Sequence, residues 1–236
     1  MDFTGILYHL NIGAKSDNPN SIEDCIVVLE YLEDDGTRQR TYMDFLCDNK
    51  TCNQNDYFFV HAVWQHLMTL NVRTRFDSIE VWSDGGPHHF KTRYCQWMWH
   101  HLSTCYFKEK MITHNFFPSY HGHSLADSHA AHDKQVVKAK YISSQVKRLP
   151  PSLSSSPSLD FGPSSSKHIQ SLLNENLSHT SAIVLDSIDR DPELKPKVAG
   201  IDRIKQKHCF VYEENKCRMS ELTADDNHEI FSFQYL

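Results

Sequence analysis

The sequence predicts a mixed α/β domain, followed by a linker and a short C-terminal segment. Two observations support this organisation. Runs of β-prone residues alternate with helical patterns over residues 1–148, and residues 149–166 then consist largely of Ser and Pro. Such a composition buries little apolar surface, so we expect a disordered linker there. Residues 167–236 remain as a small β-containing segment to which the sequence assigns no function.

Three strands are expected first. Residues 3–12 and 25–32 have β-prone patterns, and the second of these runs is rich in Ile, Val and Leu. Residues 33–37 carry turn-forming Asp and Gly, so residues 41–47 should return as the second arm of a hairpin. These elements predict an antiparallel meander.

Helices and strands then alternate. A helix capped by Asn53 or Asn55 should run through Leu70, because Phe59, Val63 and Leu67 recur on one face. The expected elements that follow are a strand at 78–82, a helix at 90–106, a strand at 112–117 and a helix at 125–146. In the C-terminal segment, strands are expected at 183–188, 207–212 and 229–235.

The predicted elements follow the order of a ribonuclease-H-like fold: three strands, then helix, strand, helix, strand and helix. In that fold, two parallel crossover strands extend an antiparallel meander into one mixed five-stranded sheet flanked by helices. We therefore predict a ribonuclease-H-like domain for residues 1–148.

Composition favours a globular protein inside the cell. Hydrophobic residues make up 39% and charged residues 23% of the chain. There is no apolar run near the roughly 20 residues that span a bilayer, and the N-terminal residues lack a signal peptide's basic and apolar regions. The seven cysteines are an odd number without a CxxC pair, which favours reduced thiols. We expect no membrane partner, no secretion and an intracellular location.

The net charge of −6 is unfavourable for binding nucleic acid, because phosphates must be neutralised by local Lys and Arg. A basic stretch does run from Lys134 to Arg148. Two interpretations stay open for it: a solvated helix face or a surface that contacts phosphates.

Three acidic residues occupy positions where this fold gathers its metal ligands. Asp2 lies in the first strand, Asp84 directly after the fourth, and Asp127 at the start of the last helix. Phosphoryl transfer on nucleic acid uses two divalent cations about 4 Å apart, and Mg²⁺ prefers carboxylate ligands. Each residue alone has an ordinary explanation, namely a solvated terminus, a turn and a helix cap. Together they predict a metal site, with Asp133 as a weaker substitute for Asp127.

Two segments carry a resemblance to a known family. They are IEVWSDGGPHHFKTRY at 79–94 and NFFPSYHGHSLADSHAAH at 115–132, preceded by MDFT at 1–4. Together they resemble transposase-derived proteins of the eukaryotic Mutator-like and related DDE elements. The resemblance implies that Asp2, Asp84 and Asp127 form a metal-binding triad holding two Mg²⁺ or Mn²⁺ ions. It also implies that the protein cleaves and transfers DNA strands, with transposon ends as its partner. It further implies a nuclear location and the capacity to form an oligomer.

The chain departs from the family pattern at three places. His123 stands where many relatives have Lys, which removes a phosphate contact, and Ala126 stands where they have Cys. The chain also begins one residue before Asp2, so we expect a truncated or domesticated copy. Two functions therefore stay open: an active nuclease or strand-transfer enzyme, and an inactive module that binds nucleic acid or protein.

Other side chains are candidates for contacting nucleic acid. Lys91 and Arg93 are candidates for contacts with backbone phosphates. The interleaved aromatic residues are expected mainly in the core, with stacking on bases as the alternative. They are Tyr94, Trp97, Trp99 and Tyr106.

Nine histidines lie between residues 88 and 132. We expect His121 and His129 to orient the metal-binding carboxylates by hydrogen bonding or to contact the scissile phosphate. A zinc site formed by His121, His123, His129 and His132 is a less favoured alternative, since no compact Cys/His quartet accompanies them.

Overall fold

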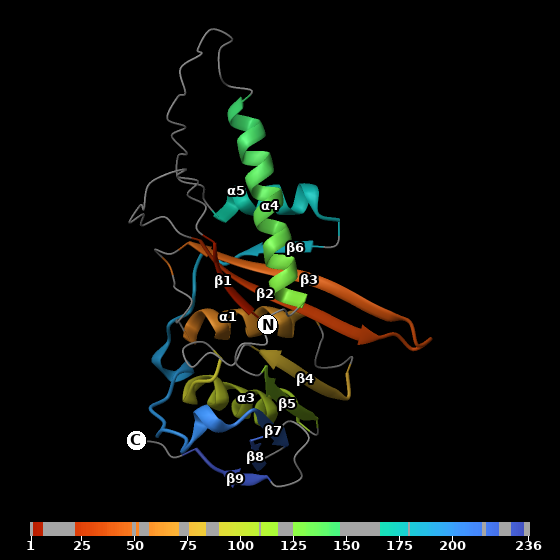
Figure 1. Ribbon diagram of the computed structural model, residues 1–236. Coiled ribbons are helices and arrows are strands. Elements are labelled where there is room, and N and C mark those ends of the chain that lie inside the picture. Colours follow the sequence, from red (N-terminus) through yellow and green to blue (C-terminus); the bar gives the residue numbers. More distant parts are fainter. Residues whose placement is uncertain are drawn as a thin grey trace. The chain divides into compact units, whose positions relative to one another are not determined.

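The computed structural model describes two compact units (Figure 1). The described residues are 2–6, 22–48, 51, 57–70, 76–83, 90–108, 110–117, 125–146, 166–178, 180–213, 216–221 and 228–233. One unit, here called the meander unit, comprises residues 2–54 and 123–187. The other, the crossover unit, comprises residues 55–122 and 188–236.

A four-stranded sheet forms the meander unit, in the order β1-β2-β3-β6. Strands β1 (Asp2–Ile6), β2 (Ile22–Leu32) and β3 (Arg38–Asp48) are antiparallel, and β6 (Thr180–Val184) runs parallel to β3. The β2–β3 turn needs Gly36, whose φ of 83° is in the left-handed region that glycine adopts most readily.

Two helices, α4 (Leu125–Val146) and α5 (Ser166–Asn176), pack on one face of this sheet. Buried apolar residues from both helices and three strands form the core between them. They are Ile22, Leu46, Val137, Ile169, Leu173 and Ala182. A smaller cluster joins Ala126 and Ala130 of α4 to Ile26 of β2. This packing places the first half of α4 over β2.

The crossover unit contains a five-stranded sheet in the order β4-β5-β7-β8-β9. Strands β4 (Ser78–Ser83) and β5 (Met111–Phe116) are parallel, and helix α3 (Arg93–Cys105) lies between them in the chain. Strands β7 (Cys209–Glu213), β8 (Lys216–Ser220) and β9 (Glu229–Phe231) continue the sheet in antiparallel fashion. Helix α1 (Tyr57–Thr69) and two short 3₁₀ helices, Pro192–Leu194 and Ile204–Gln206, complete the unit.

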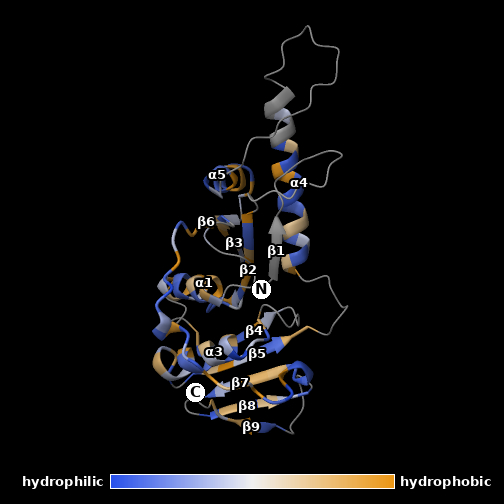
Figure 2. Cartoon of the chain, turned by 90° about the vertical axis from the view of Figure 1, so that its left-hand side faces the viewer, coloured by the Kyte–Doolittle hydropathy of each residue, from blue (hydrophilic) through white to orange (hydrophobic). Residues whose placement is uncertain are grey.

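Aromatic side chains dominate the core of the crossover unit. Trp99 packs edge-on against Trp64 at 4.3 Å between ring centroids. Phe210 and Tyr212 of β7 are fully buried, and Figure 2 shows the hydrophobic character of this strand. The hydroxyl of Tyr212 donates a hydrogen bond to the buried Gln96 side chain. This largely aromatic core therefore includes buried polar groups that are hydrogen-bonded, as Tyr212 and Gln96 are to each other.

The structure confirms the mixed α/β class and the expected element order. The elements β1, β2, β3, α1, β4, α3, β5 and α4 follow one another as predicted. The expected core positions Trp97 and Trp99 are buried, whereas Tyr106 is exposed and Tyr94 is half-buried. Among the described residues, however, the five expected strands do not share one sheet. Strands β1 and β4 are outer strands of two separate sheets.

The C-terminal segment is divided between the two units. Helix α5 and β6 complete the meander unit, while β7, β8 and β9 extend the sheet of the crossover unit. The physical reason is that β3 and β5 would otherwise be edges with unpaired backbone groups. Ser166, expected to end the linker, is instead the buried first residue of α5, and residues 149–165 lie outside the described residues.

None of the helices that the structure describes combines the length and apolar character required to cross a membrane.

Candidate metal centre

Of the three residues in the predicted acidic triad, Asp127 is the one whose side chain lies within the described part of the chain. Asp2 lies in β1, where its Cα pairs with that of Ile26, but its side chain is outside the description. Asp84 follows the last residue of β4 and also lies outside the described residues. Asp127 is half-buried in the first turn of α4. Convergence of the three carboxyl groups therefore stays a prediction.

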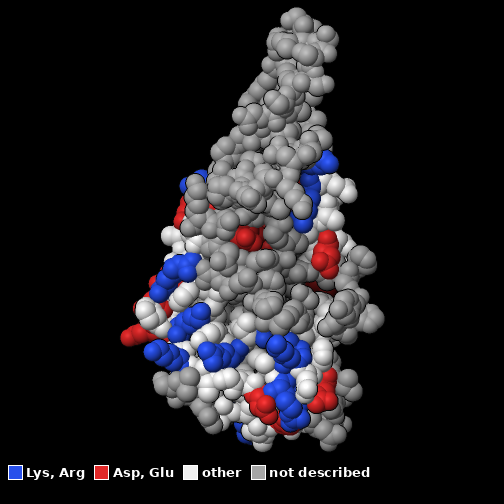
Figure 3. Space-filling model, turned by 60° about the vertical axis from the view of Figure 1, so that its left-hand side comes forward, with Lys and Arg blue, Asp and Glu red and all other residues white. Residues whose placement is uncertain are grey.

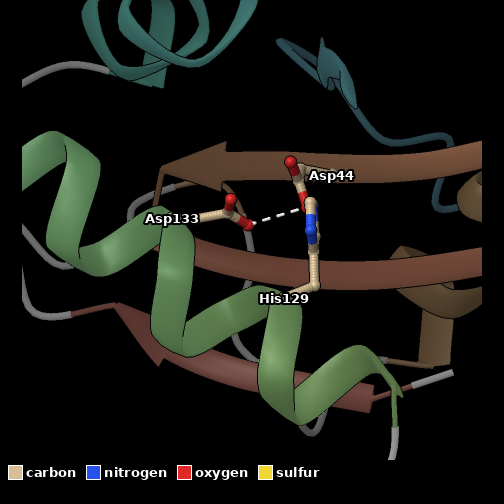
Figure 4. Close-up of side chains that lie close together, drawn as sticks. All are labelled: Asp44, His129 and Asp133. Carbon is tan, nitrogen blue, oxygen red and sulfur yellow. Dashed lines mark ion pairs between the residues drawn. The ribbon is translucent and has the colours of Figure 1, made fainter. Parts of the chain in front are cut away.

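A different set of side chains meets within the meander unit: Asp44, His129 and Asp133 (Figure 4). His129 and Asp133 are four residues apart on α4, so they project from the same helix face. Asp44 comes from β3 and pairs with Ile26, a residue that packs against α4. The helix thus brings two ligand-type side chains to a third on the sheet.

Close approach of three polar atoms defines this Asp44–His129–Asp133 cluster. The imidazole Nε2 of His129 lies 3.2 Å from Oδ2 of Asp133 and 3.6 Å from Oδ1 of Asp44. One ligand atom from each of the three residues lies within 4.8 Å of the other two. These separations suit either a shared proton or a shared cation.

The carboxylates of the cluster are buried without hydrogen-bond donors. Asp44 and Asp133 are fully buried, and none of their four side-chain oxygens has a hydrogen-bond partner. Asp24 of β2 is also fully buried, and both of its oxygens lack a partner. A buried carboxylate without compensation is costly, so this region requires a positive charge or protons.

The local electrostatics favour positive charge in the cluster. Burial and the nearby charge of Asp44, partly opposed by His129, together raise the pKa of Asp133 to about 7. Burial also raises the pKa of Asp24 well above its usual value, with Asp44 and Asp133 adding to the effect. Burial alone would lower the pKa of His129, but Asp44 and Asp133 outweigh it and the pKa is raised.

Two neighbours orient the imidazole. Tyr42 of β3 stacks on the His129 ring with centroids 4.3 Å apart and planes inclined by 17°. The hydroxyl of Thr180, in β6, lies 3.4 Å from Nε2 of the same ring. Nε2 therefore faces three oxygens, from Asp44, Asp133 and Thr180, although one ring N–H can serve only one of them well.

Of the predicted histidines that the structure describes, His129 lies in the Asp44–His129–Asp133 cluster. His121 and His123 lie outside the described residues. His132 is 58% exposed, with Nδ1 4.0 Å from Asp133. His129 lies beside the carboxylates of Asp44 and Asp133, and its expected role toward the predicted triad stays a prediction. Asp133, considered as a substitute for Asp127, is the acid of α4 that is buried here.

The two basic candidates for phosphate contacts differ in environment. Lys91 is buried, its ammonium group donates to the carbonyl of Lys205, and burial lowers its pKa to about 8. Arg93 is half-buried and lies over the ring of Tyr94, with the guanidinium carbon 4.8 Å from the centroid. Arg93 is therefore the more accessible of the two.

Sequence reasoning missed Asp24 and Asp44. Both occupy positions of β2 and β3 at which alternation places residues facing α4, next to the apolar Ile22, Ile26 and Leu46. A charged residue at an inward position of an alternating strand was the available signal.

Comparisons of the chain with protein-family models, with curated proteins and with solved structures found no match.

Proposed function

We propose that this chain is a transposase-derived domain for metal-dependent cleavage and transfer of DNA strands. The observation that carries the proposal is the element order, a three-stranded antiparallel meander followed by α1, β4, α3, β5 and α4. This is the order of a ribonuclease-H-like core. The proposed metal ligands for two Mg²⁺ or Mn²⁺ ions are Asp2, Asp84 and Asp127.

Phosphoryl transfer requires little covalent chemistry from these residues. Hydrolysis of a phosphodiester forms a bond from a water oxygen to phosphorus and breaks a phosphorus–oxygen bond of the DNA strand. The protein's part is to hold the ions that activate the water and stabilise the leaving oxygen. Asp84 immediately follows the C-terminal end of β4, the end of a parallel strand at which functional side chains gather in α/β proteins.

A group of basic and aromatic side chains in the crossover unit supports contact with nucleic acid. The Lys195 ammonium lies 4.6 Å from the ring centroid of Tyr94 and 5.6 Å from those of Tyr57 and Phe58. Arg93 lies over Tyr94, and Arg190 over Phe58. Cations beside aromatic rings suit a nucleic-acid strand, with its phosphates and bases.

Charge limits how strong this binding can be. On the face drawn in Figure 3, basic side chains lie beside acidic ones, in keeping with the net charge of −6. We therefore expect DNA binding that is weak at physiological salt and that strengthens as the salt concentration falls.

Incubation of the full chain with supercoiled plasmid and Mg²⁺ or Mn²⁺ tests the proposal. The expected result is conversion to nicked circles, lost on addition of EDTA and in Asp84→Ala. The matched control is Asp77→Ala, since Asp77 is an exposed acid just before β4, at the other end of the strand. It should nick DNA at the rate of the unchanged protein.

Absence of nicking with both metals would overturn the enzymatic proposal. If the same protein still shifts labelled DNA in a binding assay, it is an inactive nucleic-acid-binding module. Equal nicking by Asp84→Ala and by the unchanged protein would exclude Asp84 as a ligand.

A further inference from the structure

We propose that Asp44, His129 and Asp133 bind one divalent transition-metal ion, zinc or manganese, in a buried structural site that fastens α4 to β3. This ion is separate from any at Asp2, Asp84 and Asp127, and the inference does not depend on the proposed function. It rests on the geometry, burial and ligand types of the cluster.

The spacing of the donor atoms fits a common central ion. With ligands 2.0–2.1 Å from a tetrahedral zinc ion, neighbouring donor atoms lie roughly 3.3 Å apart. The separations from His129 Nε2 are 3.2 Å, to Asp133 Oδ2, and 3.6 Å, to Asp44 Oδ1. Although 3.2 Å is within hydrogen-bond distance, Asp133 Oδ2 has no hydrogen-bond partner. The spacing therefore suits a shared cation as well as a shared proton.

Burial supplies a second, independent observation. Asp24, Asp44 and Asp133 are fully buried, and all six of their side-chain oxygens lack hydrogen-bond donors. Among the described residues, the ion pairs of Asp44 and Asp133 are with histidine side chains, not with Lys or Arg. A dication bound to the two carboxylates would cancel their charge and would be coordinated by oxygen atoms that accept no hydrogen bond.

The donor set indicates which ions fit. An imidazole nitrogen is a good ligand for zinc and other transition ions, and carboxylate oxygens also suit manganese. Mg²⁺ prefers all-oxygen sites and usually keeps several waters, which a fully buried pocket of side chains excludes. Thr180 Oγ1, 3.4 Å from Nε2, and the Asp24 carboxyl are the remaining polar groups around the site.

The position of the ligands gives the ion a structural role. His129 and Asp133 lie on α4 and Asp44 lies on β3, so a bound ion joins the helix to a strand. The ligand side chains are buried or nearly so, with His129 at 9% exposure, which leaves little access for a substrate. An ion bound between two elements in the folded state contributes directly to the folding free energy.

The test uses the full chain, treated with EDTA and dialysed, then titrated with Zn²⁺, Mn²⁺ or Mg²⁺. We expect one equivalent of Zn²⁺ or Mn²⁺ to bind at this site, over and above any ions at the proposed triad, and to raise the unfolding temperature. At a free-ion concentration 100 times Kd, the folding equilibrium constant should rise about 100-fold. At the same concentration, Mg²⁺ should not bind at this site, so any stabilisation by Mg²⁺ should be unchanged in Asp133→Asn.

Asp133→Asn is the decisive variant, because it keeps the shape of the side chain and removes a buried charge. The metal-free variant should be at least as stable as the unchanged protein but should lose the stabilisation by Zn²⁺ and Mn²⁺ at this site. The matched control is His132→Gln, which changes the exposed neighbour on the same helix and should respond as the unchanged protein does. Asp84→Ala should also keep the full response, which separates this site from the proposed one for DNA cleavage.

Two results would overturn the inference. One is the absence of any stabilisation by Zn²⁺ or Mn²⁺ in the unchanged protein. The other is an equal response in Asp133→Asn, which would assign the bound ion to other histidines of the chain.

Discussion

Acid should destabilise the crossover unit through one buried side chain, His114. This residue lies in β5, is fully buried, and its Nε2 is 2.8 Å from the hydroxyl of Ser83. Its Nδ1 has no hydrogen-bond partner, and Trp99 and Phe116 lie beside the ring. Burial, assisted by the charge of Lys91, lowers the pKa of His114 to about 3.

The sign and the size of the effect follow from this shift. Because the folded pKa is below the unfolded value of 6.5, folding favours the neutral imidazole. The stability it contributes is fully present above pH 6.5 and is lost as the pH falls toward the folded pKa. Each pH unit in that range costs about 1.4 kcal/mol, so about 2.7 kcal/mol is lost by pH 4.5.

Urea unfolding of the unchanged protein and of His114→Gln between pH 7.5 and 4.5 measures this loss. All four tryptophans, residues 64, 82, 97 and 99, lie in the crossover unit, so their fluorescence reports on that unit. Gln can hydrogen-bond Ser83 but does not titrate. The unfolding free energy of the variant, relative to that of the unchanged protein, should therefore rise by about 2.7 kcal/mol over this range.

Other groups titrate in the same range, but they are common to both proteins. The remaining histidines with lowered pKa values in the crossover unit are His61, His100, His101 and His208. Parallel pH profiles for the two proteins would refute the assignment of the effect to His114.

Two further substitutions test the two cores. Tyr212→Phe should lower the unfolding free energy of the crossover unit by about 1–3 kcal/mol, because it leaves the buried Gln96 oxygen without its donor. Urea unfolding followed by tryptophan fluorescence measures this loss. A midpoint equal to that of the unchanged protein would contradict the prediction. Leu46→Ala should lower the stability of the meander unit by about 2–5 kcal/mol, measured by circular dichroism, because it opens a cavity among buried apolar residues. Leu32→Ala, at an exposed position, is its control and should change stability by less than about 0.5 kcal/mol.

Local patterns predicted most of the regular elements. The helix expected at 125–146 and the strands expected near 78–82 and 112–117 lie where periodicity and β-propensity placed them. Helix α5 was missed, because Ile169, Leu172 and Leu173 directly follow a Ser-rich stretch whose composition suggested disorder. Strand β8 was missed because KCRMS has little β-propensity and owes its conformation to pairing with β7 and β9.

Local sequence patterns could not predict which strands share a sheet. Residues 78–83 predict a strand but not its neighbours, and the pairing of β5 with β7 joins residues about a hundred positions apart. The same limit applies to the metal cluster. His129 and Asp133 were both considered from the sequence, yet their partner Asp44 could be identified only once α4 was packed on β3.

The alternation of the chain between the two units restricts how the protein can be divided. Residues 55–122 interrupt the meander unit, and residues 188–236 return to the crossover unit after the meander unit is complete. No single proteolytic cut or stop codon therefore yields either unit whole. During synthesis, β3 cannot pair with β6 until Thr180–Val184 has left the ribosome. The pairing of β5 with β7 is delayed further, until Cys209–Glu213 has emerged.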